Sequence, residues 1–317
     1  MADGTKIEWT DATWNPITGC QVKSPGCKFC YAMKLAGTRL KHHWSREGLT
    51  VDTKNGPVWT GEVRFNEEWL TQPLRWTKPR MIFVCAHADL FYEAVPDEWI
   101  DRVFAVMALA PQHIFQVLTK RPDRMRAYID AFNAGDRHIL GHAREISSKP
   151  LVLDDILPEG AKQEVAPLPN VWLGTSVEDQ ARADERREPL RDIANAGWLT
   201  WVSYEPALGM VDWRGWEFIR WMVSGGESGP NARPHNPEWH YATRDFCAPN
   251  GIPYLFKQWG NWIEEDQVAD AAATHEADLA AGRTYRFVGQ PMRFRHKSET
   301  GRLLDGRTYD GFPQVSV

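Results

Sequence analysis

Six short apolar runs recur along this 317-residue chain, each followed by polar residues and then by a segment able to form a helix. Runs of four to six residues are short for helices but right for buried strands. Strands that alternate with helices predict a parallel sheet. The sequence therefore predicts an α/β fold, a partial (β/α) barrel of about six parallel strands. The six runs are 81–85, 113–118, 171–174, 199–203, 221–224 and 252–256.

Helices are expected between these runs. Residues 97–110 carry apolar side chains near one face, with Asp97 as a candidate cap. Residues 237–248 begin with a proline, which suits the first turn of a helix. Residues 178–196 alternate arginines, among them Arg186, with carboxylates, which predicts a solvated helix face.

The domain prediction divides the chain near residue 260. Residues 1–260 are expected to form the barrel, with an insertion at about 133–170 that is long and rich in Pro and Gly. Residues 261–317 form a C-terminal extension beyond the last strand. It is expected to hold a surface helix over 264–281 and a turn-rich tail, 301–313, that folds back as a lid.

Polar residues gather just after the predicted strands. In (β/α) barrels the active site lies at the C-terminal ends of the strands, so these residues are candidates for binding. The structural alternative is that strand ends are polar wherever the chain turns at the surface. The candidates are Lys120 for an anion, Ser176 and Glu178 for ribose hydroxyls, Glu205, and the run Gly225, Gly226 and Glu227.

Composition restricts the environment and the partners of the chain. The net charge of −5 disfavours a protein that coats long DNA through its phosphates, although a local basic groove remains compatible with it. The sequence has no apolar run of the roughly 18–20 residues that span a bilayer, and its N-terminus is polar. A cytoplasmic protein is expected.

Three of the five cysteines, Cys20, Cys27 and Cys30, fall within eleven residues. In a reducing compartment such a group is more often a metal site than a disulfide framework. Thiolates suit zinc or the iron of an iron–sulfur cluster. A structural zinc site normally has four ligands, whereas a [4Fe–4S] cluster on three cysteines leaves one iron open.

A zinc site with three cysteines and one histidine is the alternative that the spacing leaves open. His42 and His43 are the nearest histidines in sequence, and Cys85 and Cys247 are further candidates for a fourth ligand. Such a site would make the chain a non-catalytic, zinc-stabilised binding protein.

The cysteine loop resembles that of radical SAM enzymes. Those enzymes carry the three-cysteine pattern Cys-x3-Cys-x-aromatic-Cys. Here Cys27, Phe29 and Cys30 match its second half, while the first gap, from Cys20 to Cys27, has six residues and not three. Five further motifs resemble a phage-associated, uncharacterised family of three-cysteine, radical-SAM-like proteins. These motifs are TWNPITGC (13–20), LTKRP (118–122), GGESG (225–229), FKQWG (256–260) and LDGR (304–307).

The resemblance implies a cofactor set and a chemistry. Cys20, Cys27 and Cys30 would hold a [4Fe–4S] cluster, the open iron would bind S-adenosyl-L-methionine (SAM), and Phe29 would lie near the adenine. A 5′-deoxyadenosyl radical would then remove hydrogen from a substrate. The run from Gly225 to Glu227 resembles the superfamily's SAM-binding glycine–glycine–glutamate motif, but it follows about the sixth strand and not the second. It could serve SAM, the substrate or a turn.

The expected substrate is a nucleic acid or a nucleotide. The phage association, the sixteen tryptophans and the cations at strand ends favour this class, as does an analogy with DNA-repairing spore photoproduct lyases. Electrons would come from an external donor. A radical SAM enzyme that modifies a peptide or protein, with a co-encoded partner protein, is the second alternative.

Overall fold

The computed structural model describes residues 4–147 and 167–314, which divide into two compact units. Within these residues the first unit comprises 4–147, 167–175 and 188–200, and the second comprises 176–187 and 201–314. This division falls at other places than residue 260, and the domain boundary there stays a prediction.

Seven strands form the main sheet, in the order β1-β6-β7-β8-β9-β10-β11. The pairs β1–β6, β6–β7, β7–β8, β9–β10 and β10–β11 are parallel. The predicted fold class is confirmed as a half-barrel, and the six apolar runs are strands of it. Their bounds are β6 Met81–Val84, β7 Ile114–Thr119, β8 Val171–Ser176, β9 Leu199–Tyr204, β10 Trp221–Gly225 and β11 Tyr254–Gln258. The sequence analysis missed the seventh, β1 Ala12–Trp14.

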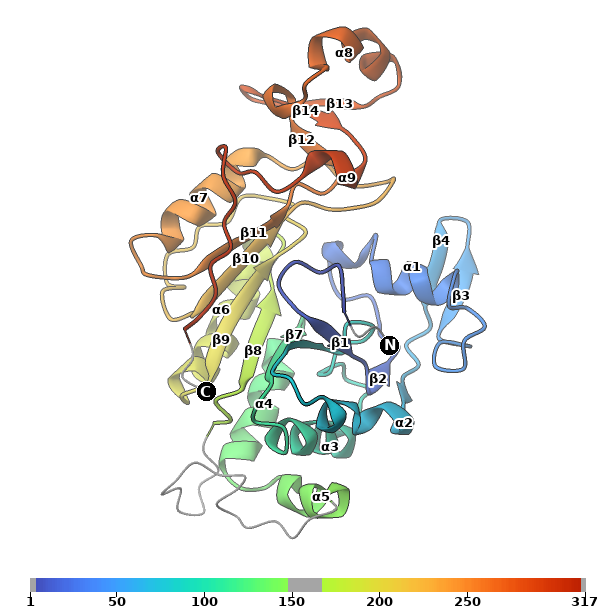
Figure 1. The fold of residues 1–317 in the computed structure, drawn as a ribbon, viewed down its shortest axis with the longest axis vertical. Coiled ribbons are helices and arrows are strands. Elements are labelled where there is room, and N and C mark those ends of the chain that lie inside the picture. Colours follow the sequence, from blue (N-terminus) through green and yellow to red (C-terminus); the bar gives the residue numbers. More distant parts are fainter. Residues whose placement is uncertain (1–3, 148–166, 315–317) are drawn as a thin grey trace. The chain divides into compact units, whose positions relative to one another are not determined.

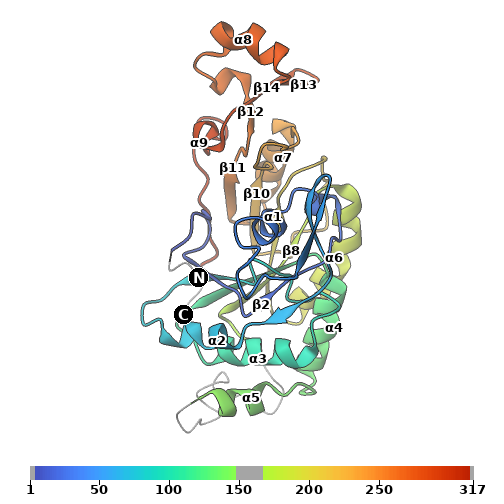
Figure 2. The same cartoon turned by 90° about the vertical axis from the view of Figure 1, so that its right-hand side faces the viewer.

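In the first unit, helices α3 Asp97–Ala108 and α4 Pro122–Asn133 lie on one side of β6 and β7 (Figures 1 and 2). Pro96 caps α3, so Asp97 is the first helical residue and not the predicted cap. The smaller elements of this unit are β2 Ile17–Thr18, α1 Tyr31–Gly37, β3 Thr50–Thr53, β4 Gly56–Trp59, β5 Arg64–Phe65, α2 Glu67–Leu70 and α5 Ile139–Ile146. Helix α5 occupies part of the predicted insertion, of which 148–166 lie outside the described residues.

In the second unit, α7 Pro237–Cys247 lies against β10 and β11. A separate antiparallel sheet follows, in the order β12-β14-β13, with α8 Ala271–Ala280 and α9 Lys297–Thr300 beside it. Its strands are β12 Trp262–Glu264, β13 Thr284–Phe287 and β14 Gln290–Phe294. The helix predicted over 264–281 is thus restricted to α8, after a 3₁₀ turn at Glu265–Gln267. Helix α6, Gln180–Asn195, begins in this unit and ends in the first.

The turn-rich tail runs beside β11. The backbone N–H of Phe256 donates to the carbonyl of Tyr309 at 3.0 Å, and that of Gly311 donates to the carbonyl of Tyr254 at 2.9 Å. The indole of Trp221 donates to the carbonyl of Gly311 at 2.8 Å. The tail therefore covers an edge of the sheet that would otherwise present unpaired backbone groups. Its movement as a lid stays a prediction.

Tryptophans supply much of the core. Six of them are among the largest fully buried side chains: Trp14, Trp172, Trp201, Trp216, Trp221 and Trp259. Within the residues described, no helix is long and apolar enough to cross a membrane.

A chain of buried hydrogen bonds crosses the second unit beneath α7. The Nε2 of His235 lies 2.8 Å from the carbonyl of Trp259, and its Nδ1 lies 2.8 Å from the Nε2 of His240. The Oγ of Ser224 lies 3.0 Å from the Nδ1 of His240 and 2.6 Å from the hydroxyl oxygen of Tyr254. Burial lowers the pKa of His235 to about 4 and holds the pKa of His240 well below its usual value. Both imidazoles are therefore neutral at pH 7.

These lowered pKa values predict a loss of stability in acid. The unfolded histidines take up protons near pH 6.5 while the folded ones do not, so the free energy of unfolding falls as the pH falls below 6.5. For the two groups together the loss between pH 6.5 and 5 is about 3 kcal/mol. Urea unfolding of the parent and of His240→Gln measures it, and the variant should lose about half as much over the same interval, because one of the two groups is gone. The exposed His138, replaced by Gln, is the control. Equal pH slopes in His240→Gln and the parent would contradict the prediction.

Candidate iron–sulfur centre

The three clustered cysteines lie on one loop of the first unit, between β2 and α1. The loop is built from tight turns, with the N–H of Cys27 donating to Ser24 at 2.9 Å and the N–H of Cys30 donating to Cys27 at 3.2 Å. Cys20, Cys27 and Cys30 are each partly exposed and form no disulfide. Cys27 and Cys30 lie close enough to Cys20 to raise its pKa, and Cys27 also raises the pKa of Cys30.

The start of the loop is fixed to the end of β6. The N–H of Gly19 donates to the carbonyl of His87 at 3.2 Å, and Gly19 forms a parallel bridge with Ala88. Gly19 has a φ of +95°, and a Cβ at this position would lie 2.2 Å from the carbonyl oxygen of Glu62. Only glycine satisfies both conditions, so the residue before Cys20 is set by backbone geometry.

The end of the loop is fixed to the same segment, which follows β6. Tyr31, which directly follows Cys30, donates its hydroxyl to the carbonyl of Ala86 at 2.6 Å. Below the loop, Cys20 and Cys30 pack against a small apolar core that joins α1 to β4. The members of that core are Ala32, Met33, Ala36, Leu49 and Trp59.

A buried ion pair connects the loop to the ends of β6 and β7. Arg121 Nη1 lies 3.0 Å from Asp89 Oδ2, and their side chains are 3% and 8% exposed. Asp89 also accepts from the hydroxyl of Thr119 at 2.6 Å and from the N–H of Lys120 at 3.0 Å. Arg121 donates to the carbonyl of Gln21, next to Cys20, at 3.3 Å. This pair therefore positions the cysteine loop as well as the two strand ends.

The surroundings of Cys20 and Cys30 favour the neutral thiol at these two positions. Burial raises the pKa of Cys20, and the carboxylate of Asp89 raises it further, while Arg121 acts in the opposite direction. Burial also raises the pKa of Cys30, and the nearby ammonium of Lys120 lowers it in part. An activated nucleophilic cysteine has a lowered pKa, so these thiols do not match that role. A bound metal supplies the positive charge that keeps such thiols deprotonated.

A single metal ion and an iron–sulfur cluster place different demands on three thiols. Among the described residues, no three His, Cys, Asp or Glu side chains are grouped tightly enough to hold one metal ion. Zinc requires its ligands at about 2.3 Å from one centre, whereas each cysteine of a [4Fe–4S] cluster binds a different iron. Which metal the three thiols hold stays a prediction.

The candidates for the fourth ligand of a zinc site are His42, His43, Cys85 and Cys247. The Nδ1 of His43 lies 2.7 Å from the hydroxyl of Ser45, and His42 is exposed. Cys85 is buried behind β6, and Cys247 is buried in the second unit.

Two other predicted residues lie in the first unit. Lys120 follows β7 and is near Cys30, as its effect on that thiol shows. Phe29 is partly exposed on the loop, with the ammonium of Lys28 5.3 Å from its ring centroid. Their roles toward SAM stay predictions.

In the second unit, the ends of β9 and β11 meet at Glu205. The ammonium of Lys257 donates to both carboxylate oxygens of Glu205, at 2.9 and 3.0 Å. Gln258 donates to Glu205 at 3.2 Å and to the hydroxyl of Ser228 at 2.9 Å. The side chains of Glu205 and Lys257 are 15% and 16% exposed. A polar ligand could therefore compete for them.

The glycine–glycine–glutamate run has strong internal contacts. A Cβ at Gly226 would lie 2.2 Å from the carbonyl oxygen of Trp259, so close packing requires glycine there. A Cβ at Gly225 would lie 3.3 Å from the carbonyl oxygen of Gln258, which is tighter than ordinary contact, and 3.6 Å from the carboxyl carbon of Glu205. Arg233 donates to Glu227 from Nε at 2.8 Å, from Nη2 at 2.5 Å and from its N–H at 2.9 Å. These contacts favour the structural turn over the SAM contact, which stays a prediction.

Ser176 and Glu178 are both buried. The Nη1 of Arg186 lies 3.0 Å from Glu178 and 2.7 Å from the carbonyl of Ser176. The side chain of Arg186 is 1% exposed, so the solvated face predicted for this arginine is wrong. Ribose binding by Ser176 and Glu178 stays a prediction that the buried ion pair does not favour.

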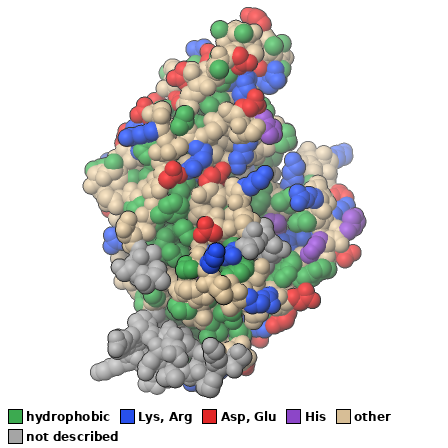
Figure 3. Space-filling model, viewed as in Figure 1, with side chains coloured by type: hydrophobic (Ala, Val, Ile, Leu, Met, Phe, Trp, Pro, Cys, Tyr) green, Lys and Arg blue, Asp and Glu red, His purple; other side chains and the backbone are tan. Residues whose placement is uncertain are grey.

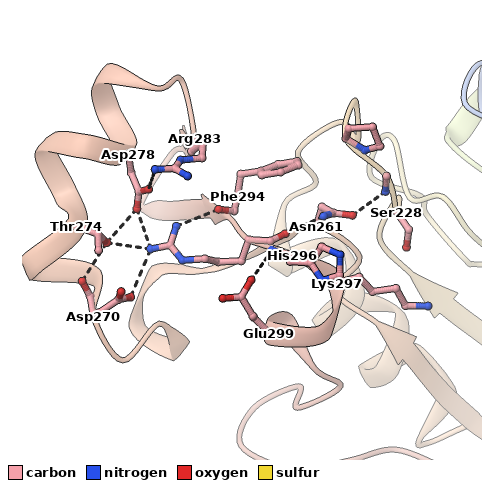
Figure 4. A pocket seen from close by; sticks show the side chains of 13 residues that line it. Ser228, Asn261, Asp270, Thr274, Asp278, Arg283, Phe294, His296, Lys297 and Glu299 are labelled. Atoms are coloured by element: carbon pink, nitrogen blue, oxygen red, sulfur yellow. Dashed lines mark hydrogen bonds and ion pairs between the residues drawn. The ribbon is translucent and has the colours of Figure 1, made fainter.

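A pocket of about 730 Å³ lies among the loops and small sheet of the second unit. Figure 4 shows Asp270, Thr274 and Asp278 on one side of it and Ser228 and Asn261 on the other. Its lining includes three carboxylates and three cations, namely Asp270, Asp278, Glu299, Arg283, Arg295 and Lys297. Several of these pair with one another, including Arg295 and Asp278 at 2.8 Å. The balance of charge selects no ion of either sign.

The structure thus groups the predicted residues into two sets. Lys120 and Phe29 accompany the cysteines in the first unit, and the other six predicted binding residues lie in the second. The sequence analysis did not predict that Asp89 and Arg121 form a buried ion pair that positions the cysteine loop. Because both follow strands that are neighbours in a parallel sheet, their opposite charges were the available signal.

Removing Arg121 should destabilise the first unit. Arg121→Met leaves the buried Asp89 carboxylate without its cation, which costs about 3–5 kcal/mol. The matched control is Arg126→Met, because the ion pair of Arg126 with Asp192 is exposed and should contribute at most about 1 kcal/mol. Urea unfolding measures both, and equal losses in the two variants would contradict the buried network.

Gly19→Ala should displace the cysteine loop. Its Cβ would collide with the backbone of Glu62, at a cost of about 2–3 kcal/mol. Gly48→Ala is the control, because Gly48 also has a positive φ but a Cβ there meets nothing within 4 Å, so only about 1 kcal/mol of strain is expected. Unfolding measurements compare the two. A smaller loss in Gly19→Ala than in Gly48→Ala would refute this reading of the loop.

Three solved structures of spore photoproduct lyase are similar to the chain. One is complexed with dinucleoside spore photoproduct (12% identity, TM-score 0.39, 89% of this chain and 68% of that chain). One is a cysteine-to-serine variant (11% identity, TM-score 0.43, 94% of this chain and 72% of that chain). One is a doubly substituted variant with bound AdoMet and dinucleoside spore photoproduct (11% identity, TM-score 0.41, 90% of this chain and 69% of that chain).

Among curated proteins, no match was found. The sequence profile of one protein family matches residues 4–313, which is nearly the whole chain. The chain therefore belongs to the family described as "Protein of unknown function (DUF5131)".

Proposed function

We propose that this chain is a radical SAM enzyme whose Cys20, Cys27 and Cys30 hold a [4Fe–4S] cluster. The observation that carries the proposal is a single loop of the first unit that presents three partly exposed thiols, none of them in a disulfide. When bound, a reduced cluster of this kind supplies the electron that cleaves a carbon–sulfur bond of SAM to give a 5′-deoxyadenosyl radical.

The chain's own residues hold the loop and set its charge. Gly19 and Tyr31 attach the two ends of the loop to the segment that directly follows β6. The ion pair of Asp89 with Arg121 fixes the backbone next to Cys20. Lys120 places a positive charge near Cys30, where it would stabilise bound thiolates or the carboxylate of SAM.

Further binding roles belong to the proposal. Phe29 is partly exposed on the loop and would contact the adenine. Glu205 is the candidate in the second unit for a polar group of a ligand, because its partner Lys257 is partly exposed with it. Binding of SAM or ribose by the remaining predicted residues has less support, since their internal contacts account for them.

The proposed substrate is a nucleic acid or a nucleotide, and the electrons come from a donor outside the chain. Support comes from aromatic side chains at the surface, such as Tyr31 and Trp44, which are 49% and 45% exposed. Bases stack on side chains of this kind.

The test is the formation of 5′-deoxyadenosine. The protein is purified without oxygen, its cluster is reconstituted, and SAM and a strong reductant are added. The proposal predicts a brown protein with about four irons per chain that releases 5′-deoxyadenosine. A colourless protein with one tightly held zinc would instead establish the zinc alternative. Product that increases only with a co-encoded peptide would move the substrate to the peptide class.

Replacing any one of the three cysteines by alanine should remove most of the bound iron. Each thiolate holds a different iron, so loss of one leaves a cluster with two protein ligands. Iron and sulfide content should fall by more than half in Cys20→Ala, Cys27→Ala and Cys30→Ala. Cys247→Ala is the matched control, because this buried cysteine lies in the second unit and should leave the iron content unchanged. Full iron content in any of the three loop variants would contradict the ligand assignment.

A further inference from the structure

The chain around the cysteine loop is strongly basic, although the whole protein is acidic. Residues 21–46 contain six lysines and arginines and no aspartate or glutamate, whereas the entire chain has a net charge of −5. The six cations are Lys23, Lys28, Lys34, Arg39, Lys41 and Arg46. Such a local excess of positive charge attracts a polyanion.

Most of these cations are at the surface. Lys28, Lys34 and Arg39 are exposed, while Arg46 is buried. Lys41 pairs with Asp52 at 2.6 Å and Lys23 with Glu93 at 3.9 Å, so Lys28, Lys34 and Arg39 carry the charge of this region. Figure 3 shows Lys, Arg and His side chains gathered on this face, over α1 and the β3–β4 hairpin. We call the exposed part of residues 28–44 the basic face.

An aromatic ring is part of the basic face. Trp44 is 45% exposed, and its ring lies 4.9 Å from that of Trp69 and 5.6 Å from that of His43. Arg64 donates to the backbone carbonyls of Trp44 and Glu47, which fixes the loop below the ring. The indole is therefore held in place from behind and from one side while much of it remains open to solvent.

The basic face is rigidly connected to the cysteines. Helix α1 begins at the residue after Cys30, and its Ala32, Met33 and Ala36 form the core against which Cys20 and Cys30 pack. Gly37 allows α1 to approach β4 closely, because a Cβ there would lie 2.0 Å from the side chain of Pro57. A ligand bound on the basic face would therefore be held beside the candidate cluster loop within the same unit.

We propose that the basic face binds single-stranded nucleic acid, with a base stacked on Trp44 and phosphates contacted by Lys34 and Arg39. Duplex DNA hides the faces of its bases, whereas a single strand offers them to an aromatic ring. An acidic protein as the ligand would use the cations of the basic face but would have no use for the exposed indole of Trp44. The inference deepens the proposed function by naming the form of its substrate.

The binding test uses the purified full-length protein and fluorescein-labelled oligonucleotides. Fluorescence anisotropy is measured for a thymidine 15-mer, a uridine 15-mer and a mixed-sequence duplex, over a range of salt concentrations. Either single strand should bind more tightly than the duplex, and the comparison of the two distinguishes DNA from RNA. Poly-glutamate should compete poorly. Equal competition by poly-glutamate, or preference for the duplex, would overturn the inference.

Two variants separate stacking from charge. Trp44→Ala should weaken binding of the single strand about tenfold, because one stacked base is lost. The double variant Lys34→Gln/Arg39→Gln should reduce the slope of log affinity against log salt by about 1.4, the value for two lost phosphate contacts. Tyr285→Ala and Arg286→Gln, both exposed on β13 of the second unit, are the matched controls and should bind like the parent. Parent-like binding by Trp44→Ala and by the double variant would refute the assignment.

The outcome is independent of the cluster chemistry. The binding assay contains neither SAM nor reductant, so a protein that binds single strands but makes no 5′-deoxyadenosine would lose the proposed function and keep this inference. A protein that makes 5′-deoxyadenosine but binds no oligonucleotide would lose only this inference.

Discussion

The buried pair of Asp89 and Arg121 joins the parts of the first unit on which its candidate site depends. Its atoms lie 3.0 Å apart, and the pair also holds the ends of β6 and β7 and the backbone next to Cys20. Two charges taken out of water stabilise a fold only when their hydrogen bonds are satisfied. Here Asp89 accepts four hydrogen bonds, from Phe91, Thr119, Lys120 and Arg121. The pair is therefore better described as a positioning device for the cysteine loop than as a site for a ligand.

The sheet could be predicted from the sequence because parallel strands buried on both faces are continuous apolar runs. β8, for example, is buried at each of its six positions. β1 could not be found this way, because Ala12–Trp14 is three residues long and includes a polar threonine. It is identified only by its pairing with β6, a contact between residues 70 positions apart.

The polar residues show where the sequence was insufficient. That charged groups follow the strands was predictable, but which of them pair with one another was not. Glu178 was expected to bind ribose and Arg186 to face solvent. Instead, the two side chains form a fully buried ion pair. Glu227 turns to Arg233 because the chain folds back within six residues. The cysteines differ from these groups, since their spacing on one loop makes them neighbours regardless of the fold.

The central claim is that the three thiols hold a cluster with one iron open to SAM. Electron paramagnetic resonance of the reconstituted and reduced protein, recorded before and after addition of SAM, tests it most directly. The account predicts the signal of a reduced [4Fe–4S] cluster and a change in that signal when SAM is added, because SAM binds to the open iron. A cluster signal that SAM leaves unchanged, or a protein that retains zinc and shows no signal, would contradict it.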